Sequence, residues 1–440
     1  MMRFFYFLLF ITLRISIPFY YKRKVGVNGP KQFYGRTIYV SNHAASFMDP
    51  LVIATTFRPI VFFMTRSDVF KGLLKPVLWA SHMLPIYRQL DGEDTKGKNE
   101  AVFKRCSRIL SFGRNLLIFG EGFTDDVFIR RLKPVKKGAV RIGFMALEEM
   151  NWKKKVYIAA IGCNYTEPSK MQSELLISAS DKICLNDYKE QFLENPNQVI
   201  NTLTKRIEKL MQEQITHVEN KEWASFHENV MMLTRKGMNS DSHDDSIQLK
   251  ERWNYSRKLA LWMNEQDLDN NEELVKLKKE TEGYFSLLKR FKLQENYVFD
   301  ALTKKSRMKE FLFLIFMWPF ALIGIVHGII PYIVTKKFAE KTFKRIVFWS
   351  SVKMMMGKLI WGILNIPYIF VFYHFVYPSY WLGFAYFLMI GPLFSLIGYK
   401  YMLNFQSYKR KEVVGKMELS KFIAKREELL GKIKEVIEVA

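Results

Sequence analysis

A histidine and an aspartate lie close together in the segment SNHAASFMDP, residues 41–50. A run of β-branched and aromatic residues ends at Ser41, so we expect His43 at the C-terminal end of a strand. Asp49-Pro50 fits the N-cap and first residue of the next helix. A neutral imidazole can take a proton from a hydroxyl, and a carboxylate on its other nitrogen fixes its tautomer. The pair therefore predicts a general base with an orienting acid; a capping aspartate beside an incidental loop histidine is the alternative.

Two further segments carry residue types suited to a phosphorylated ligand. Residues 83–92 (MLPIYRQLDG) place Arg88 between a short apolar run and a glycine turn. A guanidinium there can hold a phosphate through two hydrogen bonds, and an ordinary surface arginine is the alternative. A cluster of cations follows later in the chain: Arg130, Arg131, Lys133, Lys136, Lys137 and Arg141. This cluster predicts either a solvated face or a patch that faces the phosphates of a substrate or a lipid.

Glycines surround a glutamate in residues 116–126 (LLIFGEGFTDD), where a β-rich run leads into Gly120-Glu121-Gly122. Glycines let backbone amides approach a ligand, and Glu121 can orient a basic group or a substrate hydroxyl. The glycine pair is not a dinucleotide fingerprint, because no third glycine follows. A fourth segment, residues 159–168 (AAIGCNYTEP), predicts a strand that ends in Gly162, Asn164 and Tyr165.

Other patterns are weaker. Residues 92–98 have phosphate-loop spacing, but Asn99 replaces the hydroxyl residue that would hold magnesium. His243 lies among three aspartates, which fits a polar loop better than a metal site. The pattern G-x-S-x-G is absent from the sequence, which counts against a serine lipase. We expect no metal and no cofactor.

The composition narrows the class of protein. The chain has 440 residues, with 67 Lys+Arg against 43 Asp+Glu and a net charge of +24. Hydrophobic residues make up 49%, which excludes disorder over most of the chain. Three cysteines exclude a disulfide scaffold and a four-cysteine zinc site. The basic excess is compatible with nucleic acid, a membrane surface or phosphorylated substrates, but we find no nucleic-acid motif and expect no nucleic-acid partner.

The last third of the chain carries three long apolar runs, residues 311–334, 359–376 and 379–399. The first has no charge and is long enough to cross a bilayer core as a helix, although prolines and glycines interrupt it. Tyr and Trp crowd the turn between the other two, as in an interfacial aromatic belt. A buried helical core of a soluble domain is the alternative to membrane helices.

The lysines and arginines that flank these runs predict their orientation. Residues 335–345 and 400–411 are both basic, so both should be cytoplasmic. A tight hairpin made by 359–376 and 379–399 satisfies this rule if 311–334 re-enters the membrane without crossing it. At the N-terminus, ten apolar residues followed by Tyr20-Tyr21-Lys22-Arg23-Lys24 predict an interfacial anchor with the cluster at the lipid headgroups.

The region between the apolar segments alternates two kinds of pattern. Strands are expected at 37–41, 60–64, 116–119, 156–161 and 174–178, and helices at 98–111 and 138–148. Such alternation is typical of an α/β sandwich. The sequence thus predicts an α/β fold in these parts: 1–24 membrane anchor, 25–187 α/β domain, 188–306 charged helical region, 307–405 membrane region and 406–440 cytoplasmic helical tail.

The four segments resemble, in order and spacing, the glycerolipid acyltransferase superfamily, which includes glycerol-3-phosphate and 1-acylglycerol-3-phosphate acyltransferases. The resemblance covers about residues 40–180, roughly a third of the chain. His43 and Asp49 resemble the family's His-x₄-Asp signature. Arg88 ends a segment similar to its G-x-x-x-x-x-R block.

The third and fourth segments continue the resemblance. Phe119, Glu121 and Gly122 resemble the family's F-P-E-G, and residues 132–143 (LKPVKKGAVRIG) resemble the stretch that follows it. The strand Ile161–Tyr165 resembles the fourth motif, whose implied role is a wall of the acyl pocket.

The sequence departs from the family pattern at several positions. Five residues separate His43 from Asp49 where the family has four, and an extra residue can bulge in the loop without breaking the pair. Gly120 and Ala160 stand where proline is usual. Phe123-Thr124 replaces the arginine of the bacterial type, which shifts the expected phosphate contact to Arg88 and the basic cluster. The longer spacing, residues 132–143 and the membrane segments resemble the fungal-type branch, which acylates glycerol 3-phosphate or dihydroxyacetone phosphate.

The resemblance implies an acyltransferase-type α/β domain and a specific chemistry. His43 would deprotonate the acceptor hydroxyl and Asp49 would orient His43. Arg88, Glu121, Gly122 and the cluster members Arg130, Arg131, Lys133 and Lys136 would bind substrate. The implied partners are an acyl-CoA or acyl-carrier-protein donor, a glycerol-phosphate acceptor and membrane lipids.

The resemblance also implies a location and leaves alternatives open. The catalytic domain would lie on the cytoplasmic face of a membrane, the inner or plasma membrane if the source is bacterial. An inactive membrane scaffold with this fold is the alternative from another class, and an acyltransferase that acts on a non-glycerol lyso-lipid is the alternative within the class.

Overall fold

The computed structural model describes residues 2–28, 35–56, 61–70, 72, 74–87, 95–122, 124–303 and 306–439. The chain divides into two compact units. Unit 1 comprises Met1–Ala224 and Asp245–Glu265, and unit 2 comprises Ser225–Asp244 and Gln266–Ala440. The α/β region and the apolar C-terminal helices therefore belong to different units.

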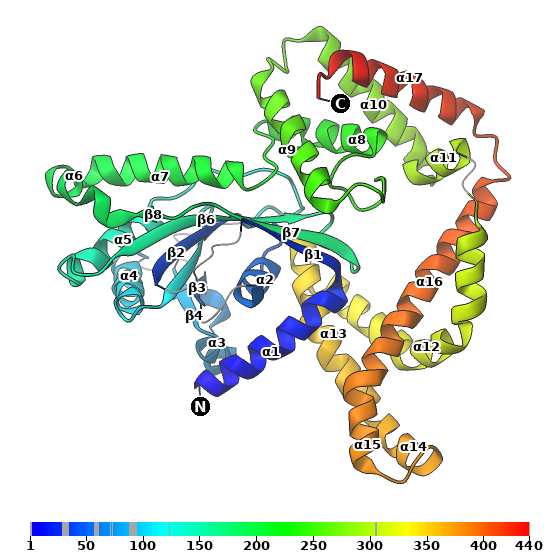
Figure 1. The fold of residues 1–440 in the computed structure, drawn as a ribbon, viewed down its shortest axis with the longest axis horizontal. Coiled ribbons are helices and arrows are strands. Elements are labelled where there is room, and N and C mark those ends of the chain that lie inside the picture. The colour runs from blue at the N-terminus through cyan, green and yellow to red at the C-terminus, as the bar shows by residue number, and fades with distance from the viewer. Residues whose placement is uncertain are drawn as a thin grey trace. The chain divides into compact units, whose positions relative to one another are not determined.

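Unit 1 is built on a mixed sheet with strand order β1-β7-β6-β2-β5-β3-β4, and β8 pairs with β6 (Figure 1). The pairs β6–β7 and β6–β8 are antiparallel, and the other pairs along this order are parallel. The strands are β1 Tyr21–Val27, β2 Arg36–Ser41, β3 Val61–Arg66, β4 Met83–Ile86, β5 Asn115–Phe119, β6 Val156–Tyr165, β7 Ser173–Ala179 and β8 Ile183–Cys184. The predicted α/β fold is confirmed, and each of the five predicted strands corresponds to an observed one.

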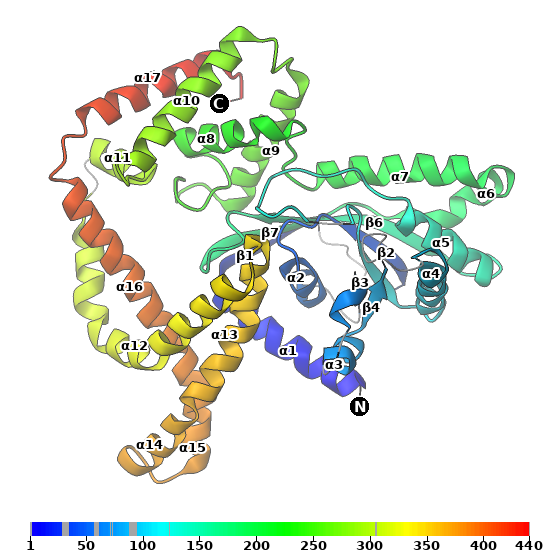
Figure 2. The ribbon, with the colours of Figure 1, turned by 180° about the vertical axis from the view of Figure 1, so that it is seen from behind.

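Helices cover both faces of this sheet. Figure 1 shows α7 and α9 on one face with α1 and α2 on the other, and Figure 2 shows the same two layers from behind. The helices of unit 1 are α1 Met2–Tyr20, α2 Met48–Thr56, α3 Leu74–Ala80, α4 Thr95–Ser111, α5 Gly138–Glu149, α6 Lys189–Glu194, α7 Pro196–Glu213 and α9 Leu249–Glu265. The helices predicted at 98–111 and 138–148 are observed as α4 and α5.

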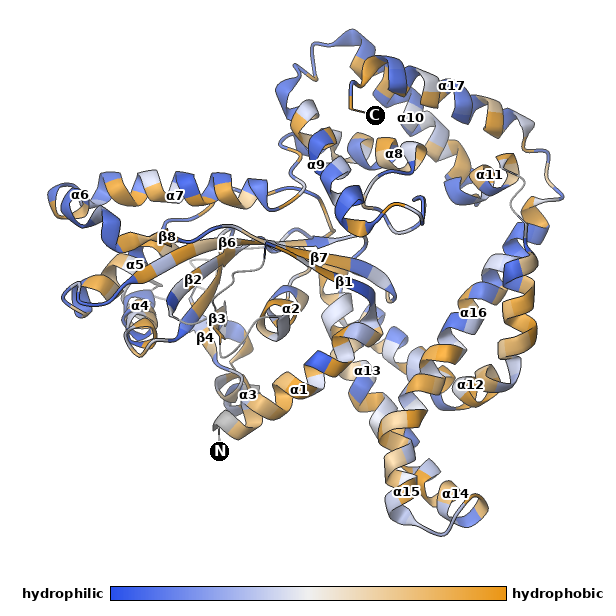
Figure 3. Cartoon of the chain, viewed as in Figure 1, coloured by the Kyte–Doolittle hydropathy of each residue, from blue (hydrophilic) through white to orange (hydrophobic). Residues whose placement is uncertain are grey.

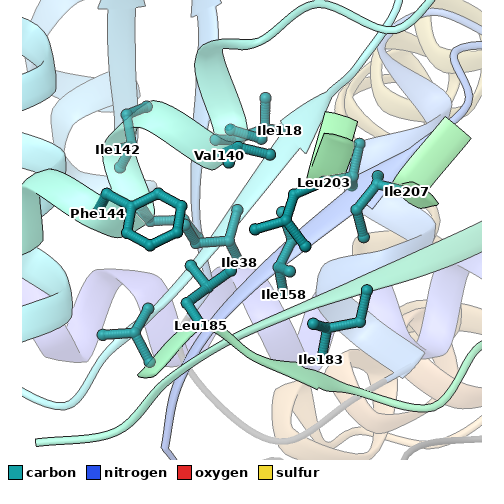
Figure 4. Close-up of a cluster of buried hydrophobic side chains, with 14 of the residues drawn as sticks. Ile38, Ile118, Val140, Ile142, Phe144, Ile158, Ile183, Leu185, Leu203 and Ile207 are labelled. Atoms are coloured by element: carbon teal, nitrogen blue, oxygen red, sulfur yellow. The ribbon is translucent and has the colours of Figure 1, made fainter. Parts of the chain in front are cut away.

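The main core of unit 1 lies under α5 and α7. Val140 and Phe144 stand four positions apart on α5, so both face the sheet, where Ile38 of β2 and Ile158 of β6 are fully buried (Figure 4). Leu203 of α7 closes the same cluster. Because side chains alternate along a strand, this face takes the even positions of β2 and leaves Tyr39 and Ser41 to the opposite face.

The N-terminal segment differs from the prediction. The cluster expected at the lipid headgroups is partly inside the sheet, because β1 begins at Tyr21 and pairs in parallel with β7. The β-branched and aromatic residues of that short run fill an edge strand. The helix α1 before it exposes large apolar side chains: Phe4, Phe7, Leu8, Ile11 and Ile15.

Unit 2 is helical. Its helices are α8 Ala224–Thr234, which starts at the unit boundary, α10 Glu272–Arg290, α11 Glu295–Leu302, α12 Met308–Thr342, α13 Trp349–Asn365, α14 Pro367–Phe375, α15 Tyr380–Ala385, α16 Gly391–Val414 and α17 Ser420–Val436. Three helical segments are long and apolar enough to cross a membrane, Met308–Thr342, Ile346–Phe375 and Tyr380–Val414. Figure 3 shows the hydrophobic residues along these segments. These segments contain the three predicted apolar runs except for Val376 and Ser379, and they are consistent with a membrane protein.

The first apolar segment is one helix. α12 continues through Pro319 and Pro331, so the break suggested by these prolines is not observed. Gly324 of α12 lies so close to α16 that an added Cβ would stand 1.9 Å from the carbonyl oxygen of Phe394. Small residues at such crossings let helix backbones pack directly against each other. The number of membrane crossings stays a prediction.

A polar hub joins these apolar helices. The buried His327 of α12 has Nε2 2.8 Å from the hydroxyl of Tyr386, in the π-helical turn Tyr386–Ile390. Asn365 of α13 donates to the backbone carbonyls of His327 and Trp361, and its side-chain oxygen meets His327 Nδ1. The buried polar groups thus satisfy one another, as an apolar environment requires.

Gly162 of β6 packs closely against the chain that follows α7, and this contact can be tested. A Cβ at Gly162 would lie 2.0 Å from the carbonyl oxygen of Gln214, which is backbone and cannot turn away. We expect Gly162→Ala to lower the stability of unit 1 by about 3 kcal/mol, at the upper end of overpacking costs. Thermal unfolding of the purified protein measures this. The matched control is Gly26→Ala in β1, where no atom lies within 4 Å of the added Cβ and the unfolding midpoint should stay nearly unchanged.

Candidate active site

Three segments meet at the C-terminal end of β2, near the middle of the sheet. Ser41, the last residue of β2, pairs with Phe119 of β5 and with Ile161 of β6. The side chain of Asn42 continues this edge, because Nδ2 donates to the Cys163 carbonyl at 3.0 Å and Oδ1 accepts from the Cys163 N–H at 2.8 Å. Ligands of open α/β sheets bind outside such strand ends. The first, third and fourth predicted segments are therefore brought together.

The predicted histidine–aspartate pair is formed. His43 Nδ1 lies 3.1 Å from Asp49 Oδ2, and the aspartate is fully buried. The His43 side chain is 20% exposed and stacks on the Phe119 ring, with 4.0 Å between ring centroids. No polar atom among the described residues bonds to His43 Nε2. When Nδ1–H donates a hydrogen bond to the carboxylate, Nε2 carries the lone pair of the neutral ring and can accept a proton.

The loop between the two residues takes up the extra position. Ser46 has φ +50°, in the left-handed region, and the N–H groups of Met48 and Asp49 donate back to Ala45 and Ser46. This tight turn is a local bulge that leaves the pair in contact. One detail of the prediction is wrong: α2 begins at Met48, so Asp49 lies in its first turn and is not the N-cap. Its carboxylate instead accepts the Ala45 N–H at 2.9 Å, from the loop before the helix.

A third group holds the aspartate, and the sequence did not assign it. The Tyr165 hydroxyl, at the end of β6, donates to Asp49 Oδ1 at 2.8 Å. Burial raises the pKa of Tyr165 well above its ordinary value, and the negative charge of Asp49 adds to this shift, so the phenol stays a neutral donor. Tyr165 was expected only as part of a pocket wall. The sequence predicted that Tyr165 ends a strand. Its contact with Asp49 also depends on the register of β6 against β2, which the sequence did not predict.

Glu121 holds the same loop from its other side. Its Oε1 accepts the His43 backbone N–H at 2.8 Å, and its Oε2 accepts the Lys133 N–H at 3.2 Å. Burial raises the pKa of the Glu121 carboxyl above its ordinary value, while the two N–H donors oppose that shift. Both oxygens are therefore engaged by the protein, and Glu121 positions His43 and the basic segment. Gly122 has φ +76°, which favours glycine.

The cations of the basic cluster have unequal surroundings. Arg130 is buried and donates to the carbonyls of Tyr165 and Thr166 at 2.8 and 3.3 Å, so it anchors the end of β6. Lys133 Nζ lies 3.1 Å from Asp125 Oδ1. Arg131 is half-buried. Lys136 is exposed and has no ion pair with a described residue; its Nζ would be 2.9 Å from a Cβ at Gly122.

The second predicted segment is described only in part. Arg88 lies outside the described residues. The block that Arg88 ends begins at His82, which replaces the family's glycine. His82 nevertheless has φ +59°, and its ring is stacked between Tyr6 and Phe62. The stacked rings stabilise a backbone conformation that glycine adopts more readily.

Comparison with known families supports the assignment of this domain. Residues 24–164 match the family model described as Acyltransferase. A search of curated proteins found no match. The matched range holds β2, the His43–Asp49 loop, Glu121 and nearly all of β6. The chain therefore carries an acyltransferase domain of the glycerolipid acyltransferase superfamily, and the fungal-type branch stays a prediction.

The role of Tyr165 can be tested by removing one oxygen. We expect Tyr165→Phe to keep the fold and to lower acyl transfer roughly 10-fold, since a buried carboxylate that loses a donor is destabilised by about 1–3 kcal/mol and no longer holds His43 as well. Turnover and thermal unfolding are measured together. Tyr21→Phe is the matched control, because the Tyr21 ring lies 5.6 Å from the Tyr165 ring and its hydroxyl bonds to none of the described residues. Full activity in Tyr165→Phe would contradict this role.

Proposed function

We propose that this protein is a membrane-bound O-acyltransferase that moves an acyl chain from a thioester donor to a hydroxyl of a glycerol-phosphate acceptor. The observation that carries the proposal is the His43–Asp49 contact of 3.1 Å, with a partly exposed His43 side chain whose Nε2 bonds to no described residue. A base of this kind in an acyltransferase domain needs a hydroxyl and an activated acyl group as substrates.

The reaction follows from the atoms of the site. His43 Nε2 takes the proton of the acceptor hydroxyl as its oxygen attacks the thioester carbonyl carbon. Asp49, held by Tyr165 and Ala45, stabilises the imidazolium that forms. Backbone amides near the strand ends stabilise the oxyanion of the tetrahedral intermediate. The intermediate then expels the thiolate, and the imidazolium returns the proton to that sulfur, so no covalent acyl-enzyme is required.

The acceptor is proposed from the cations around the base. Lys136, exposed beside Gly122 and without an ion pair among the described residues, is a candidate for the acceptor phosphate. Arg88 stays a candidate from the sequence alone. Glycerol 3-phosphate, dihydroxyacetone phosphate and 1-acylglycerol 3-phosphate all provide a hydroxyl near a phosphate. The donor is an acyl-CoA or an acyl carrier protein, and the product enters phospholipid synthesis.

The membrane is proposed as the place of this reaction. The three apolar helical segments of unit 2 support an integral protein, and the exposed apolar side chains of α1 support an interfacial anchor on unit 1. The basic segments beside the apolar helices favour a catalytic domain on the cytoplasmic face. The competing hypothesis, an inactive scaffold with this fold, does not require the contact between the buried Asp49 carboxylate and the His43 ring.

The central experiment measures acyl transfer by the full-length protein in detergent, with each acceptor and each donor class in turn. We expect His43→Ala to lower turnover by roughly 10²–10⁴-fold, the usual contribution of a general base. His374→Ala, in α14 of unit 2, is the matched histidine control and should keep wild-type turnover. Wild-type activity in His43→Ala would refute the mechanism.

The acceptor used decides the reaction step. Transfer to glycerol 3-phosphate or dihydroxyacetone phosphate would make the protein catalyse the first acylation of phospholipid synthesis. Transfer only to 1-acylglycerol 3-phosphate would make it catalyse the second. Absence of His43-dependent transfer to all of them, with either donor, would refute the glycerol-phosphate proposal and favour the scaffold or another lyso-lipid.

The proposed topology predicts which positions are reachable from outside the cell. Cysteine introduced at Tyr377, in the turn between two apolar segments, should react with an impermeant thiol reagent applied to intact cells. Cysteine introduced at Glu340, in the basic segment, should react only after the membrane is opened. Labelling of position 340 in intact cells would contradict the topology. The parent protein, with its own three cysteines, sets the background.

A further inference from the structure

Two cations near the candidate site lack a counter-ion. Lys24 of β1 and Arg14 of α1 form no ion pair and no hydrogen bond with a described residue. The guanidinium of Arg14 lies over the Phe10 ring, 5.9 Å from its centroid. The sequence placed Lys24 in the cluster expected at the lipid headgroups and gave Arg14 no role. Lys24 is half-buried and Arg14 is exposed.

Strand register places Lys24 on the face of the sheet that carries the site. Lys24 pairs with Leu175 of β7, and Leu175 pairs with Tyr165 of β6, so the three residues form one row across the sheet. Partners in such a row point to the same face. Two strand spacings separate the Cα atoms of Lys24 and Tyr165, about 10 Å. The side chains of Lys24 and Tyr165 therefore leave the same face, and Tyr165 reaches Asp49 there.

The neighbouring residue of β1 shows the contrast. Arg23 points to the opposite face, where its guanidinium lies 3.5 Å from Glu174, and Glu174 also bonds to the buried Arg252 of α9. On that face the cations share a carboxylate. On the face of Lys24 the neighbouring groups that act on its charge are Cys163 from β6 and Arg14 from α1, and β7 contributes the apolar Leu175.

The electrostatics around Lys24 favour the binding of an anion. Burial lowers the pKa of Lys24 to about 8; Cys163 opposes the shift and the charge of Arg14 adds to it. Burial raises the pKa of the Cys163 thiol well above its ordinary value, so the thiol is neutral and gives Lys24 no counter-charge near pH 7. A desolvated ammonium beside a second cation is costly for the fold, and an anion that binds there would relieve this cost.

We infer that Lys24 and Arg14 bind the phosphate of the acyl acceptor while its hydroxyl lies at His43 Nε2. The inference rests on the proposed function and names a phosphate contact for it. An ammonium and a guanidinium are the cations that hold phosphate groups in proteins. In glycerol 3-phosphate and dihydroxyacetone phosphate the C1 hydroxyl and the phosphate are at opposite ends of three carbons, so one acceptor can contact two separate groups on the same sheet face. This contact would supplement Lys136 and Arg88.

The first test reads binding without requiring activity. At pH 8 an amine-acylating reagent should modify Lys24 of the full-length protein, and mass spectrometry follows the modification at each lysine. Glycerol 3-phosphate should protect Lys24 and glycerol should not. Lys22, on the same strand but beside Glu174 at 4.0 Å, is the internal control and should stay unprotected. The inference would be overturned if only coenzyme A or only anionic lipid vesicles protected Lys24, or if no compound protected it.

The second test separates binding from turnover. Lys24→Met should raise the acceptor KM by roughly 10–100-fold and leave kcat within about threefold, because a charged hydrogen bond to phosphate is lost before the chemical step. The donor KM should not change. Lys24→Arg should restore most of the acceptor affinity. Lys22→Met, the matched control, should keep the wild-type acceptor KM.

Two readouts exclude a merely structural role. For the wild type, kcat/KM for the acceptor should fall as the pH rises through about 8, where Lys24 loses its charge, and Lys24→Arg should move this fall to higher pH. Replacing a poorly solvated charge with Met should keep or raise the unfolding midpoint of the protein near pH 7. A lowered midpoint with unchanged acceptor KM would overturn the inference.

The outcomes separate this inference from the proposed function. If the wild type transfers no acyl chain but glycerol 3-phosphate protects Lys24, the anion site stands and the proposed reaction fails. If transfer depends on His43 but Lys24→Met keeps the wild-type acceptor KM, the reaction stands and the anion site fails.

Discussion

The buried carboxylate of Asp49 is the constraint on which the candidate site depends. A charge removed from water is tolerated only when donors replace its hydration. Here the donors are the Tyr165 hydroxyl at 2.8 Å, the Ala45 N–H at 2.9 Å and His43 Nδ1 at 3.1 Å. They come from a strand, a loop and the catalytic histidine of our proposal. One desolvated group thus fixes the distance between β6, α2 and the loop that joins β2 to α2.

A second buried carboxylate makes this loop rigid from the other side. Glu121 accepts the backbone N–H of His43, while Asp49 takes its ring nitrogen and Phe119 packs against its ring plane. One segment, which carries Phe119 and Glu121, therefore holds the backbone and the ring face of His43, and Asp49 of α2 holds the ring edge. A general base requires such support, because the distance between its nitrogen and the substrate oxygen must stay within a range of a few tenths of an ångström.

The sequence predicted the parts of this site whose signals are local. Strand composition located β2, β5 and β6, and the spacing of His43 and Asp49 suggested their contact. The capping pattern, however, predicted a start of α2 at Pro50, two residues after the observed one. Tyr165 could not be assigned a partner, because its bond to Asp49 depends on strand register that is set by packing. Arg130 was grouped with exposed cations, yet its guanidinium is buried against the end of β6. Composition cannot distinguish these two environments within one basic run.

The N-terminus shows a similar limit. Its Tyr-Lys-Arg-Lys cluster has the composition of a membrane interface, and only the pairing of β1 with β7 reveals an edge strand. Edge strands carry charged residues for reasons unrelated to lipids, since charge there discourages pairing with other chains. A segment can therefore satisfy the composition rules of two environments, and long-range pairing decides between them.

The polar hub of unit 2 has a consequence for folding during synthesis. A chain is synthesised from its N-terminus, so α12 is complete before Asn365 and Tyr386 exist. Until α13 and the π-helical turn emerge from the ribosome, the His327 imidazole lacks both of these partners. A polar side chain without partners is strongly disfavoured in an apolar medium. The hydrogen bonds of His327 in α12 are therefore complete only after α13 and the π-helical turn have been synthesised, so these three elements must assemble together.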